Sequence, residues 1–413
     1  MRGELIIVGD EVLDGRVLNV NGRRLAARLA SAGLPVSRIT TVGDESEVLG
    51  RVLAHAARLA DFVLVTGGLG HTDDDLTTAV AAESFDRPLT LHEGVLERIA
   101  SVCRKRGREM GRLERLAWLP RGAEPLAPEE HFCGFHLVQD RCLLFFLPGV
   151  PEEVLDLFDR KVLPRLMARF SDRPFFRQRT VKLLGLTESE VSARLQGLAR
   201  DHPQVALGSY PNFPEVHLSL TVKGKDEAGL ETALDRMEED LKTRLGPYII
   251  GRDRETLPRT VGRLLTERGL TLATAESCTG GRAAQMITSV PGSSAYFIQG
   301  VVTYANGAKE SLLGVDPLDL RDFGAVSSRV AAAMAQGLRE RAGVDLTVSV
   351  TGIAGPDGGR EDKPVGTVFF GLASADRVQV EKRKFIGPRR WVQVQAAAWS
   401  LNMIRRYLTA SEQ

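Results

Sequence analysis

The sequence lacks several patterns that would place it at once in a broad class of protein. Its four cysteines form no C-x-x-C pair, so neither a structural zinc site nor a disulfide framework is predicted, and we expect a reducing, cytoplasmic setting. No run of about 18 apolar residues occurs, and we expect no membrane association. The 54 Lys and Arg residues balance 53 Asp and Glu residues without a block of like charge, so nucleic acid is an unexpected partner.

The 413 residues divide by pattern into three predicted domains. Residues 1–170 alternate short β-branched runs with amphipathic helices, which predicts an α/β fold with a parallel, doubly wound sheet. Residues 171–250 follow the order strand, helix, strand, strand, helix, with the first helix expected over 187–199. This order predicts a small α+β domain that serves as a spacer or a dimerisation domain. The pattern over residues 257–410 predicts a second α/β domain. A polar segment with Gly and Pro at 251–258 comes before it and is predicted to be a linker.

Two segments outside the main motifs carry structural expectations. The last predicted helix, Pro388–Leu408, has apolar side chains at helical spacing that we expect in the core: Trp391, Val394, Ala398, Leu401 and Ile404. The segment Tyr210–Pro214 is predicted to be an exposed loop. Turn chemistry alone explains its residues, and the alternative is that the loop reaches toward a neighbouring site.

The sharpest motif is Ala275-Glu276-Ser277-Cys278-Thr279-Gly280-Gly281, placed where an apolar strand ends and a helix begins. Such a turn exposes a nucleophile, and the N–H groups of the first helical turn can receive an oxyanion or a phosphate. The two glycines allow a ligand to approach the backbone. Ser277 and Cys278 are rival nucleophiles, since a thiol at a helix N-terminus can have a depressed pKa, whereas a free cysteine is often a small buried hydrophobe.

A serine nucleophile needs a base, and the chain has no histidine after His217, which excludes a Ser-His-Asp triad within the last domain. Lys309 is the alternative base, because it follows a strand and a polar turn that contains Tyr304. A lysine desolvated beside Ser277 would have a lowered pKa and would accept the hydroxyl proton. Tyr304 would then act as a relay or as an orienting donor.

A third polar segment, residues 350–359, also follows an apolar strand in the last domain. Ligands of open α/β sheets bind at such strand ends. Turn chemistry explains any one of the three segments by itself, but the three together predict one cleft. The residues that this segment contributes are Thr351, Gly352 and Gly355.

The first domain has a candidate site of its own after the strand 61–65. The glycines that follow can cradle phosphate, and the carboxylates beside them can hold a divalent cation such as Mg²⁺, Mn²⁺ or Co²⁺. The alternatives are structural, because aspartates are ordinary helix caps and a lone loop histidine such as His71 is usually solvated. The predicted metal ligands are Asp74 and Asp75, and the predicted nucleotide-binding residues are Glu11, Asn21, Asp44, Gly67, Gly68, Gly70 and Thr72. In the last domain, the residues predicted to bind the oxyanion or the substrate around Ser277 are Cys278, Thr279, Gly280 and Gly281.

These motifs together resemble the competence- and damage-inducible protein A (CinA) family over essentially the whole chain. The segments 275–281, 300–309 and 350–359 are similar to those of nicotinamide mononucleotide deamidases. The resemblance implies hydrolysis of nicotinamide mononucleotide to nicotinate mononucleotide and ammonia, without a cofactor. It implies Ser277 as the nucleophile and Lys309 and Tyr304 as its partners. The oxyanion would then be stabilised by backbone N–H groups near Thr279 and Gly280.

The first domain resembles the molybdopterin-binding fold as this family uses it, which implies metal-dependent hydrolysis of ADP-ribose to AMP and ribose 5-phosphate. The pattern G-G-L-G-P-T-x-D-D-x-T is matched from Gly67 to Thr77, except that His71 stands where proline is usual. The turn P-G-x-P-x-E is matched from Pro148 to Glu153. Other matches to the family are Glu11, Gly15, Asn21 and Asp44.

Two other functions stay open at this point. The first domain is alternatively a regulatory or assembly module that binds a nucleotide or a pterin phosphate without catalysis. A role as a DNA-processing accessory is disfavoured by the balanced charge. Edge strands in the middle domain favour a symmetric homodimer.

Overall fold

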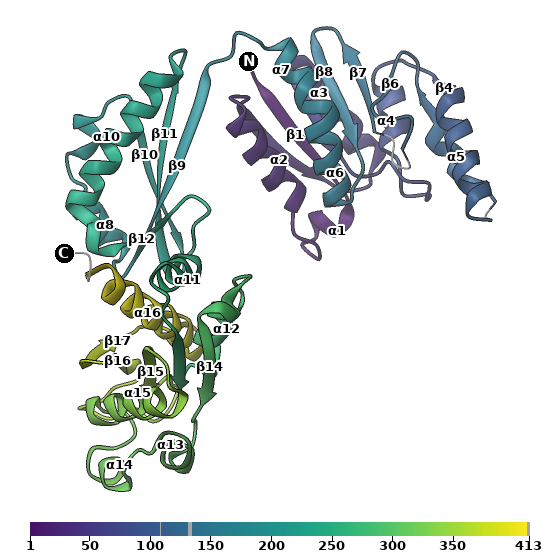
Figure 1. Cartoon of the computed structure of the whole chain (residues 1–413). Helices are drawn as coiled ribbons and strands as arrows, with labels where there is room; N and C mark the ends of the chain where they lie inside the picture. The colour runs from purple at the N-terminus through teal and green to yellow at the C-terminus, as the bar shows by residue number, and fades with distance from the viewer. Residues whose placement is uncertain (108, 131–133, 411–413) are drawn as a thin grey trace. The chain divides into compact units, whose positions relative to one another are not determined.

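The computed structural model describes residues 1–107, 109–130 and 134–410. The chain forms two compact units, of which the first contains residues 1–177 and 223–227. The second contains residues 178–222 and the chain from 228 onward, so most of the predicted middle domain belongs to one unit with the predicted last domain (Figure 1). Within the described residues, every helix is too short or too polar to span a bilayer.

The first unit is built on a six-stranded sheet with the strand order β2-β1-β3-β8-β7-β6 (Figure 1). Strands β2, β1, β3 and β8 are parallel, whereas β7 runs antiparallel to β8. The predicted α/β fold with a doubly wound sheet is confirmed, and the edge strand β7 departs from the parallel order because the two-residue turn Asp140-Arg141 closes only an antiparallel hairpin. The strands are β1 (Gly3–Val8), β2 (Val36–Val42), β3 (Phe62–Thr66), β6 (Glu124–Pro125), β7 (Phe135–Gln139) and β8 (Cys142–Leu147).

Helices cover both faces of this sheet, as its apolar strands require. On β1, Leu5 packs in one core with α2 and α6, and Ile6 packs in another with α3 and α4. A small hairpin of β4 (Leu89–Leu91) and β5 (Trp118–Pro120) lies outside the main sheet. The helices are α1 (Asp10–Leu13), α2 (Val20–Ser31), α3 (Ser46–Leu59), α4 (Thr77–Ser84), α5 (Glu93–Lys105), α6 (Pro151–Leu157) and α7 (Leu163–Arg169), with a 3-10 helix at Gly111–Ala117 and a π-helical turn at Phe158–Val162.

The middle segment forms a four-stranded sheet in the order β10-β11-β9-β12. The predicted helix over 187–199 is divided in two at Gly197, which has a φ of +87°. Residues 210–212 belong to β10, so the predicted exposed loop is mostly strand. The elements are β9 (Phe175–Leu184), α8 (Glu188–Arg194), α9 (Leu198–Asp201), β10 (Ala206–Asn212), β11 (Glu215–Gly224), α10 (Glu227–Leu245), a 3-10 turn at Gly246–Tyr248, and β12 (Ile249–Arg252).

The last segment forms a five-stranded sheet in the order β14-β13-β15-β16-β17. Strands β14, β13 and β15 are parallel, and β16 and β17 are antiparallel to their neighbours. The strands are β13 (Leu272–Glu276), β14 (Phe297–Val302), β15 (Leu346–Gly352), β16 (Thr367–Ala373) and β17 (Val378–Lys384). The helices are α11 (Leu257–Arg268), α12 (Arg282–Thr288), α13 (Asn306–Leu313), α14 (Pro317–Phe323), α15 (Ser328–Ala342) and α16 (Arg389–Ala410), with a 3-10 turn at Ser293–Ala295.

The middle and last segments share one hydrophobic core. Leu184 and Ile250 of the middle sheet are buried in the same cluster as Leu257 of α11 and the apolar face of α16. Lys182 also donates through Nζ to the carbonyl of Glu255. The predicted linker at 251–258 is therefore packed against the middle sheet, because its single apolar side chain completes the shared core.

Helix α16 confirms three of its five predicted core positions. Ala398, Leu401 and Ile404 are buried, Val394 is half-buried, and Trp391 is 49% exposed. The Trp391 ring contacts the ring of Phe213, with 4.8 Å between the centroids. Phe213 lies in the turn after β10, so this part of the predicted loop does contact the neighbouring domain, and it draws Trp391 away from the core.

Three cysteines lie in the described part of the chain. Cys103, Cys142 and Cys278 are all free and buried. Cys133 lies outside the described residues.

Candidate active sites

The register of the last sheet brings the predicted catalytic segments to one edge. Glu276, at the end of β13, pairs with Val302 of β14 on one side and with Val350 of β15 on the other. The residues that follow these three strands therefore leave the sheet side by side. Ser277 is fixed there by its backbone N–H, which donates to the carbonyl of Val350 at 2.9 Å.

Lys309 lies on α13 and reaches back to Ser277. Its Nζ donates to Ser277 Oγ at 3.2 Å. The same Nζ donates to the carbonyl of Thr303 at 2.8 Å and to that of Tyr304 at 3.2 Å. Two backbone carbonyls thus hold the amine against the serine hydroxyl, as a catalytic pair requires.

Burial sets the protonation of this pair. Lys309 is 1% exposed and Ser277 is 8% exposed. Desolvation lowers the pKa of Lys309, because burial penalises the ammonium form, and among the described residues no carboxylate pairs with it. A neutral amine has a free electron pair and can accept the proton of the serine hydroxyl.

Cys278 has the opposite properties. Its side chain is 4% exposed and packs in the shared hydrophobic core. Burial raises the pKa of this thiol to about 12, so it is protonated at neutral pH. The thiolate is the reactive form of cysteine, and this environment therefore disfavours Cys278 as the nucleophile.

Tyr304 is predicted to act as a relay or as an orienting donor, but within the described residues its phenol forms no hydrogen bond with Ser277 or Lys309. Its side chain is 62% exposed, and its hydroxyl accepts from Nη2 of Arg389 at 2.8 Å. Only the backbone carbonyl of Tyr304 contacts Lys309. The expected phenol relay is corrected accordingly, because the strand turn directs this side chain outward toward α16.

Two site residues on α16 were missed from the sequence. Arg389 donates through Nη1 to the carbonyl of Gly355 at 2.9 Å, and through Nη2 to Tyr304. Gln393 donates through Nε2 to the carbonyl of Cys278 at 2.9 Å. The two residues are four apart and so share one helix face, which was the available signal in a helix treated only as core.

Glu276 organises the loop that carries Ser277. It is 1% exposed, and its carboxylate accepts from the N–H groups of Gly281 at 3.0 Å, Ala283 at 3.1 Å and Ala284 at 2.8 Å. The N–H of Gly280 donates to the carbonyl of Ser277 at 3.1 Å. Gly280 and Gly281 therefore differ from their expected role as oxyanion donors, since a buried carboxylate and a tight turn already use these groups.

The donors that remain in this loop are the N–H groups of Cys278 and Thr279. Neither group donates to another residue within the described part of the chain. Thr279 is also 3% exposed, and its hydroxyl is buried without a partner. All three groups have a hydrogen that they can donate to a negative oxygen beside Ser277.

The segment after β15 contributes one direct contact to the site. The Gly355 carbonyl holds Arg389, as described. Thr351 instead donates through its hydroxyl to the carbonyl of Ala325 at 2.8 Å, and is 1% exposed. A Cβ at Gly352 would lie 2.7 Å from Cγ2 of Val368. Thr351 and Gly352 thus serve strand packing in this structure.

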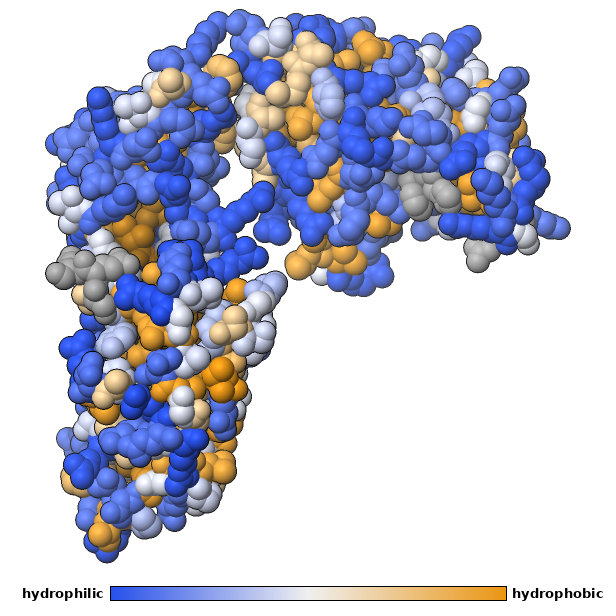
Figure 2. All heavy atoms as spheres, viewed as in Figure 1, coloured by the Kyte–Doolittle hydropathy of each residue, from blue (hydrophilic) through white to orange (hydrophobic). Residues whose placement is uncertain are grey.

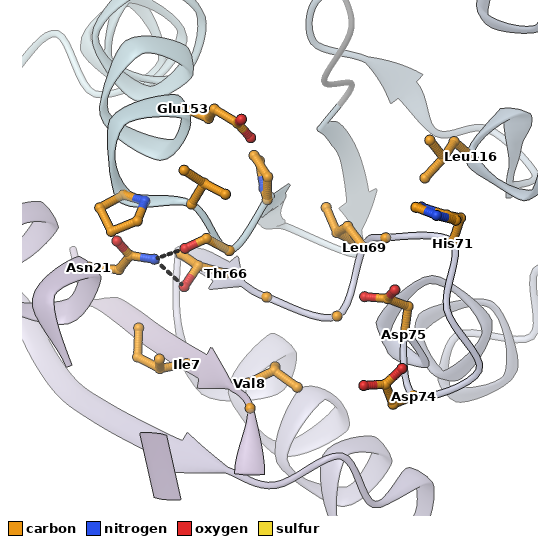
Figure 3. Close-up of a pocket in the computed structure, with 18 of the residues that line it drawn as sticks. Ile7, Val8, Asn21, Thr66, Leu69, His71, Asp74, Asp75, Leu116 and Glu153 are labelled. Atoms are coloured by element: carbon orange, nitrogen blue, oxygen red, sulfur yellow. Dashed lines mark hydrogen bonds between the residues drawn. The ribbon is translucent and has the colours of Figure 1, made fainter. Parts of the chain in front are cut away.

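The first unit contains a cavity of about 700 Å³ at the carboxyl ends of β1, β2 and β3 (Figure 3). Most of the residues predicted to bind the nucleotide or the metal line this cavity: Glu11, Asn21, Asp44, Gly67, Gly68, Gly70, Asp74 and Asp75. Thr72 does not line it, but donates to the carboxylate of Asp75 through its N–H at 2.8 Å and its hydroxyl at 2.5 Å. Figure 2 shows apolar atoms over α1 and the loop after it, where Leu13, Val17 and Leu18 are exposed.

The glycine loop can adopt its path only because it has no side chains. Gly67 has a φ of +102°, and a Cβ there would lie 2.2 Å from the carbonyl oxygen of Val8. The hydroxyl of Thr77 donates to the Gly67 carbonyl at 2.9 Å and anchors the loop to α4. The N–H groups of Gly68, Leu69 and Gly70 reach no acceptor in the described part of the chain, so they are free to bind an anion.

The aspartates of the loop do not cap α4. The residue before that helix is Leu76, and no side chain caps it. Asp73 instead pairs with Arg112 at 2.7 Å and Arg115 at 3.1 Å. The carboxylates of Asp74 and Asp75 lie on the same side of the loop (Figure 3).

Carboxylates also gather at the end of β2. Burial raises the pKa of Asp44, and the negative charges of Asp10, Glu11 and Asp74 raise it further. No three metal-binding side chains in the described residues are close enough to form a complete metal centre. Mg²⁺ needs only one or two carboxylates with substrate phosphate and water. The predicted ligand Asp74 and its neighbour Asp44 fit that requirement, whereas Oδ2 of the other predicted ligand, Asp75, accepts two hydrogen bonds from Thr72.

Two buried oxygens on the cavity wall have no partner within the described residues. Asn21 donates to the Gly149 carbonyl at 2.8 Å and to Thr66 Oγ1 at 3.4 Å, but its Oδ1 accepts nothing (Figure 3). Glu153 Oε2 is also unpartnered, and burial raises the pKa of this carboxyl. Such groups are suited to binding hydroxyl or amino groups of a ligand.

Comparison with known proteins covers the whole chain. Residues 4–168 match a probable molybdopterin binding domain, residues 178–251 the KH domain of damage-inducible protein CinA, and residues 254–408 the CinA C-terminal domain. The CinA-like proteins of Geobacter sulfurreducens and Geobacter metallireducens are 44% identical over 411 residues and 43% identical over 410, with 99% of each chain covered.

A solved structure, the competence-damaged protein (CinA) superfamily protein from Enterobacter cloacae, is 32% identical. It covers 37% of this chain and 90% of its own, with a TM-score of 0.36. The family models follow one another along the sequence in the order of the three predicted domains, and the Geobacter relatives align from end to end. The chain therefore belongs to the CinA family.

Proposed function

We propose that the site at Ser277 hydrolyses the carboxamide of nicotinamide mononucleotide to give nicotinate mononucleotide and ammonia. The observation that carries this proposal is the 3.2 Å contact between Ser277 Oγ and a buried Lys309 Nζ whose pKa is lowered. A serine activated by a neutral amine suits attack on an amide. The resemblance of the three surrounding segments to nicotinamide mononucleotide deamidases supports the choice of substrate.

The proposed reaction proceeds in two halves. Ser277 Oγ attacks the carboxamide carbon while Lys309 takes the hydroxyl proton, and the carbonyl oxygen becomes an oxyanion. The N–H groups of Cys278 and Thr279 are the proposed donors to this oxyanion. The lysine returns its proton to the departing nitrogen, ammonia leaves, and water then hydrolyses the acyl ester to release the acid.

Arg389 is the proposed anchor for the substrate phosphate. It is exposed beside Tyr304, and a carbonyl and a hydroxyl hold its guanidinium in a fixed orientation. Guanidinium groups match the geometry of phosphate oxygens. The proposed reaction needs no proton transfer by Tyr304, so we assign Tyr304 to positioning Arg389.

Ammonia release from nicotinamide mononucleotide by the purified full chain tests this function. Ser277→Ala and Lys309→Ala should each lower kcat at least about 100-fold, because each removes half of the catalytic pair. Cys278→Ala should keep most of the activity. An inactive Cys278→Ala beside an active Ser277→Ala would assign the nucleophile to the thiol, and no ammonia from the parent chain would reject the substrate.

We further propose that the cavity of the first unit hydrolyses ADP-ribose to AMP and ribose 5-phosphate with a divalent cation. The free N–H groups of the glycine loop beside Asp44 and Asp74 support this proposal. The cation, when bound, would neutralise diphosphate charge. AMP release with Mg²⁺, Mn²⁺ or Co²⁺ should be lost in Asp74→Asn. Nucleotide binding without any AMP release would favour the regulatory module instead.

A further inference from the structure

One wall of the cavity in the first unit carries positive charge that the loop motifs do not explain. Helix α5 and its C-cap place five residues on this wall at helical spacing: Arg98, Ile99, Val102, Cys103 and Arg106. In the described part of the chain, neither Arg98 nor Arg106 has a side-chain hydrogen bond or ion pair, and Arg98 Nε is buried without a partner. These are two uncompensated cations at one cavity.

Glu11, Asp44, Asp74, Asp75, Glu130 and Glu153 also line the cavity, and in the described part of the chain none of them forms an ion pair with either arginine. The carboxylate of Glu130 is held by Arg160 at 2.7 Å and 2.8 Å. Asp44 and Asp74 lie near each other on the strand-end side of the cavity, where the negative charge of Asp74 is one of the causes that raise the pKa of Asp44. A buried donor without an acceptor is costly, so the arrangement favours an anionic ligand against α5.

We infer that Arg98 and Arg106 form a second phosphate-binding wall, which makes the cavity selective for diphosphate esters over monophosphates. The glycine loop, with its free N–H groups, supplies the first phosphate position. The α5 wall supplies the second, because guanidinium groups bind phosphate oxygens through paired N–H donors. This inference rests on the proposed nucleotide site and names the class of substrate that the site takes.

Binding of ADP and of AMP to the full chain with Mg²⁺, measured by titration calorimetry, tests the inference. The double variant Arg98→Gln/Arg106→Gln should raise the Kd for ADP at least about tenfold, while the Kd for AMP changes less than about twofold. Arg104→Gln is the matched control, because Arg104 is exposed on the same helix and does not line the cavity. It should leave both constants unchanged.

Two results would overturn the inference: an unchanged Kd for ADP in the double variant, or an equal loss of affinity for ADP and AMP. Arg98→Lys/Arg106→Lys guards against misfolding, because it keeps both charges and should bind ADP more tightly than the glutamine pair. Hydrolysis of ADP-ribose is a separate measurement. If the parent chain prefers ADP but does not cleave ADP-ribose, the proposed activity is wrong and the second phosphate wall stands. If the glutamine pair cleaves ADP-ribose normally, the second phosphate wall is wrong and the proposed activity stands.

Discussion

At the scale of single residues, the burial of Lys309 controls the pH dependence of the proposed deamidation. Its pKa lies below the usual 10.5, so the neutral amine that accepts the serine proton is present at lower pH than for an exposed lysine. We expect kcat/KM to rise with pH and to level off below 10.5. At pH values below the pKa of Lys309, kcat/KM should fall about tenfold for each pH unit, and this decline is the acid limb of the profile. A pH profile of ammonia release measures it.

Controls separate Lys309 from its neighbours. Lys309→Arg stays protonated at every accessible pH, so it should be inactive throughout. Cys278→Ala should keep the acid limb at the same pH. A limb that moves in this variant, or a residual limb in Lys309→Arg, would assign the titration to another group.

The sequence allowed the Ser277 and Lys309 pair to be predicted, because both stand next to strand ends whose parallel order brings them together. The direction of the Tyr304 side chain could not be predicted in this way. Its partner, Arg389, is 85 residues further along the chain. Local spacing has no information on a contact that depends on how α16 packs against the sheet.

At the scale of elements, Glu276 is expected to hold the start of α12. Its carboxylate accepts three backbone N–H groups that no other group in the described chain accepts. Glu276→Gln keeps the size of the side chain but replaces one acceptor oxygen with a donor. We expect a loss of about 1–3 kcal/mol in the free energy of unfolding, measured in urea, together with lower ammonia release as the Ser277 loop loosens.

The matched control is Glu267→Gln, on the adjacent helix α11. Glu267 is exposed and pairs with Arg263 at 2.8 Å. An exposed ion pair contributes at most about 1 kcal/mol, so this variant should remain close to the parent. Equal destabilisation by the two substitutions would contradict the special role of Glu276.

The sequence predicted helices and strands well where apolar residues recur at a regular period. The prediction was wrong where one residue or one turn determines the structure. Helix 187–199 contained no proline, yet Gly197 divides it through a left-handed φ of +87°. The direction of β7 depended on a two-residue turn, and alternation within the strand cannot reveal it. The position of Trp391 depended on Phe213, a residue of another domain.

At the scale of the whole molecule, the two units should unfold as separate transitions, because each has its own cores. In the second unit, the middle and last segments are joined by Arg405, which is 7% exposed. Arg405 donates through Nη2 to the carbonyl of Pro247 at 3.0 Å and through Nε to Asn402 Oδ1 at 2.9 Å. Burial lowers the pKa of this guanidinium to about 10, which is still high enough to keep it charged at neutral pH.

Arg405→Ala would leave the Pro247 carbonyl and Asn402 without donors inside the shared core. We expect a loss of about 2 kcal/mol, which corresponds to a shift of about 4–8 °C in the Tm of the second unit. Calorimetry of the full chain should show the transition of the first unit unchanged. Arg406→Ala, which removes an exposed ion pair with Glu381 at 2.8 Å, should shift neither transition by more than a few degrees. A single transition that moves as a whole in Arg405→Ala would mean that the two units unfold together, because coupling between them would then exceed the stability of either core.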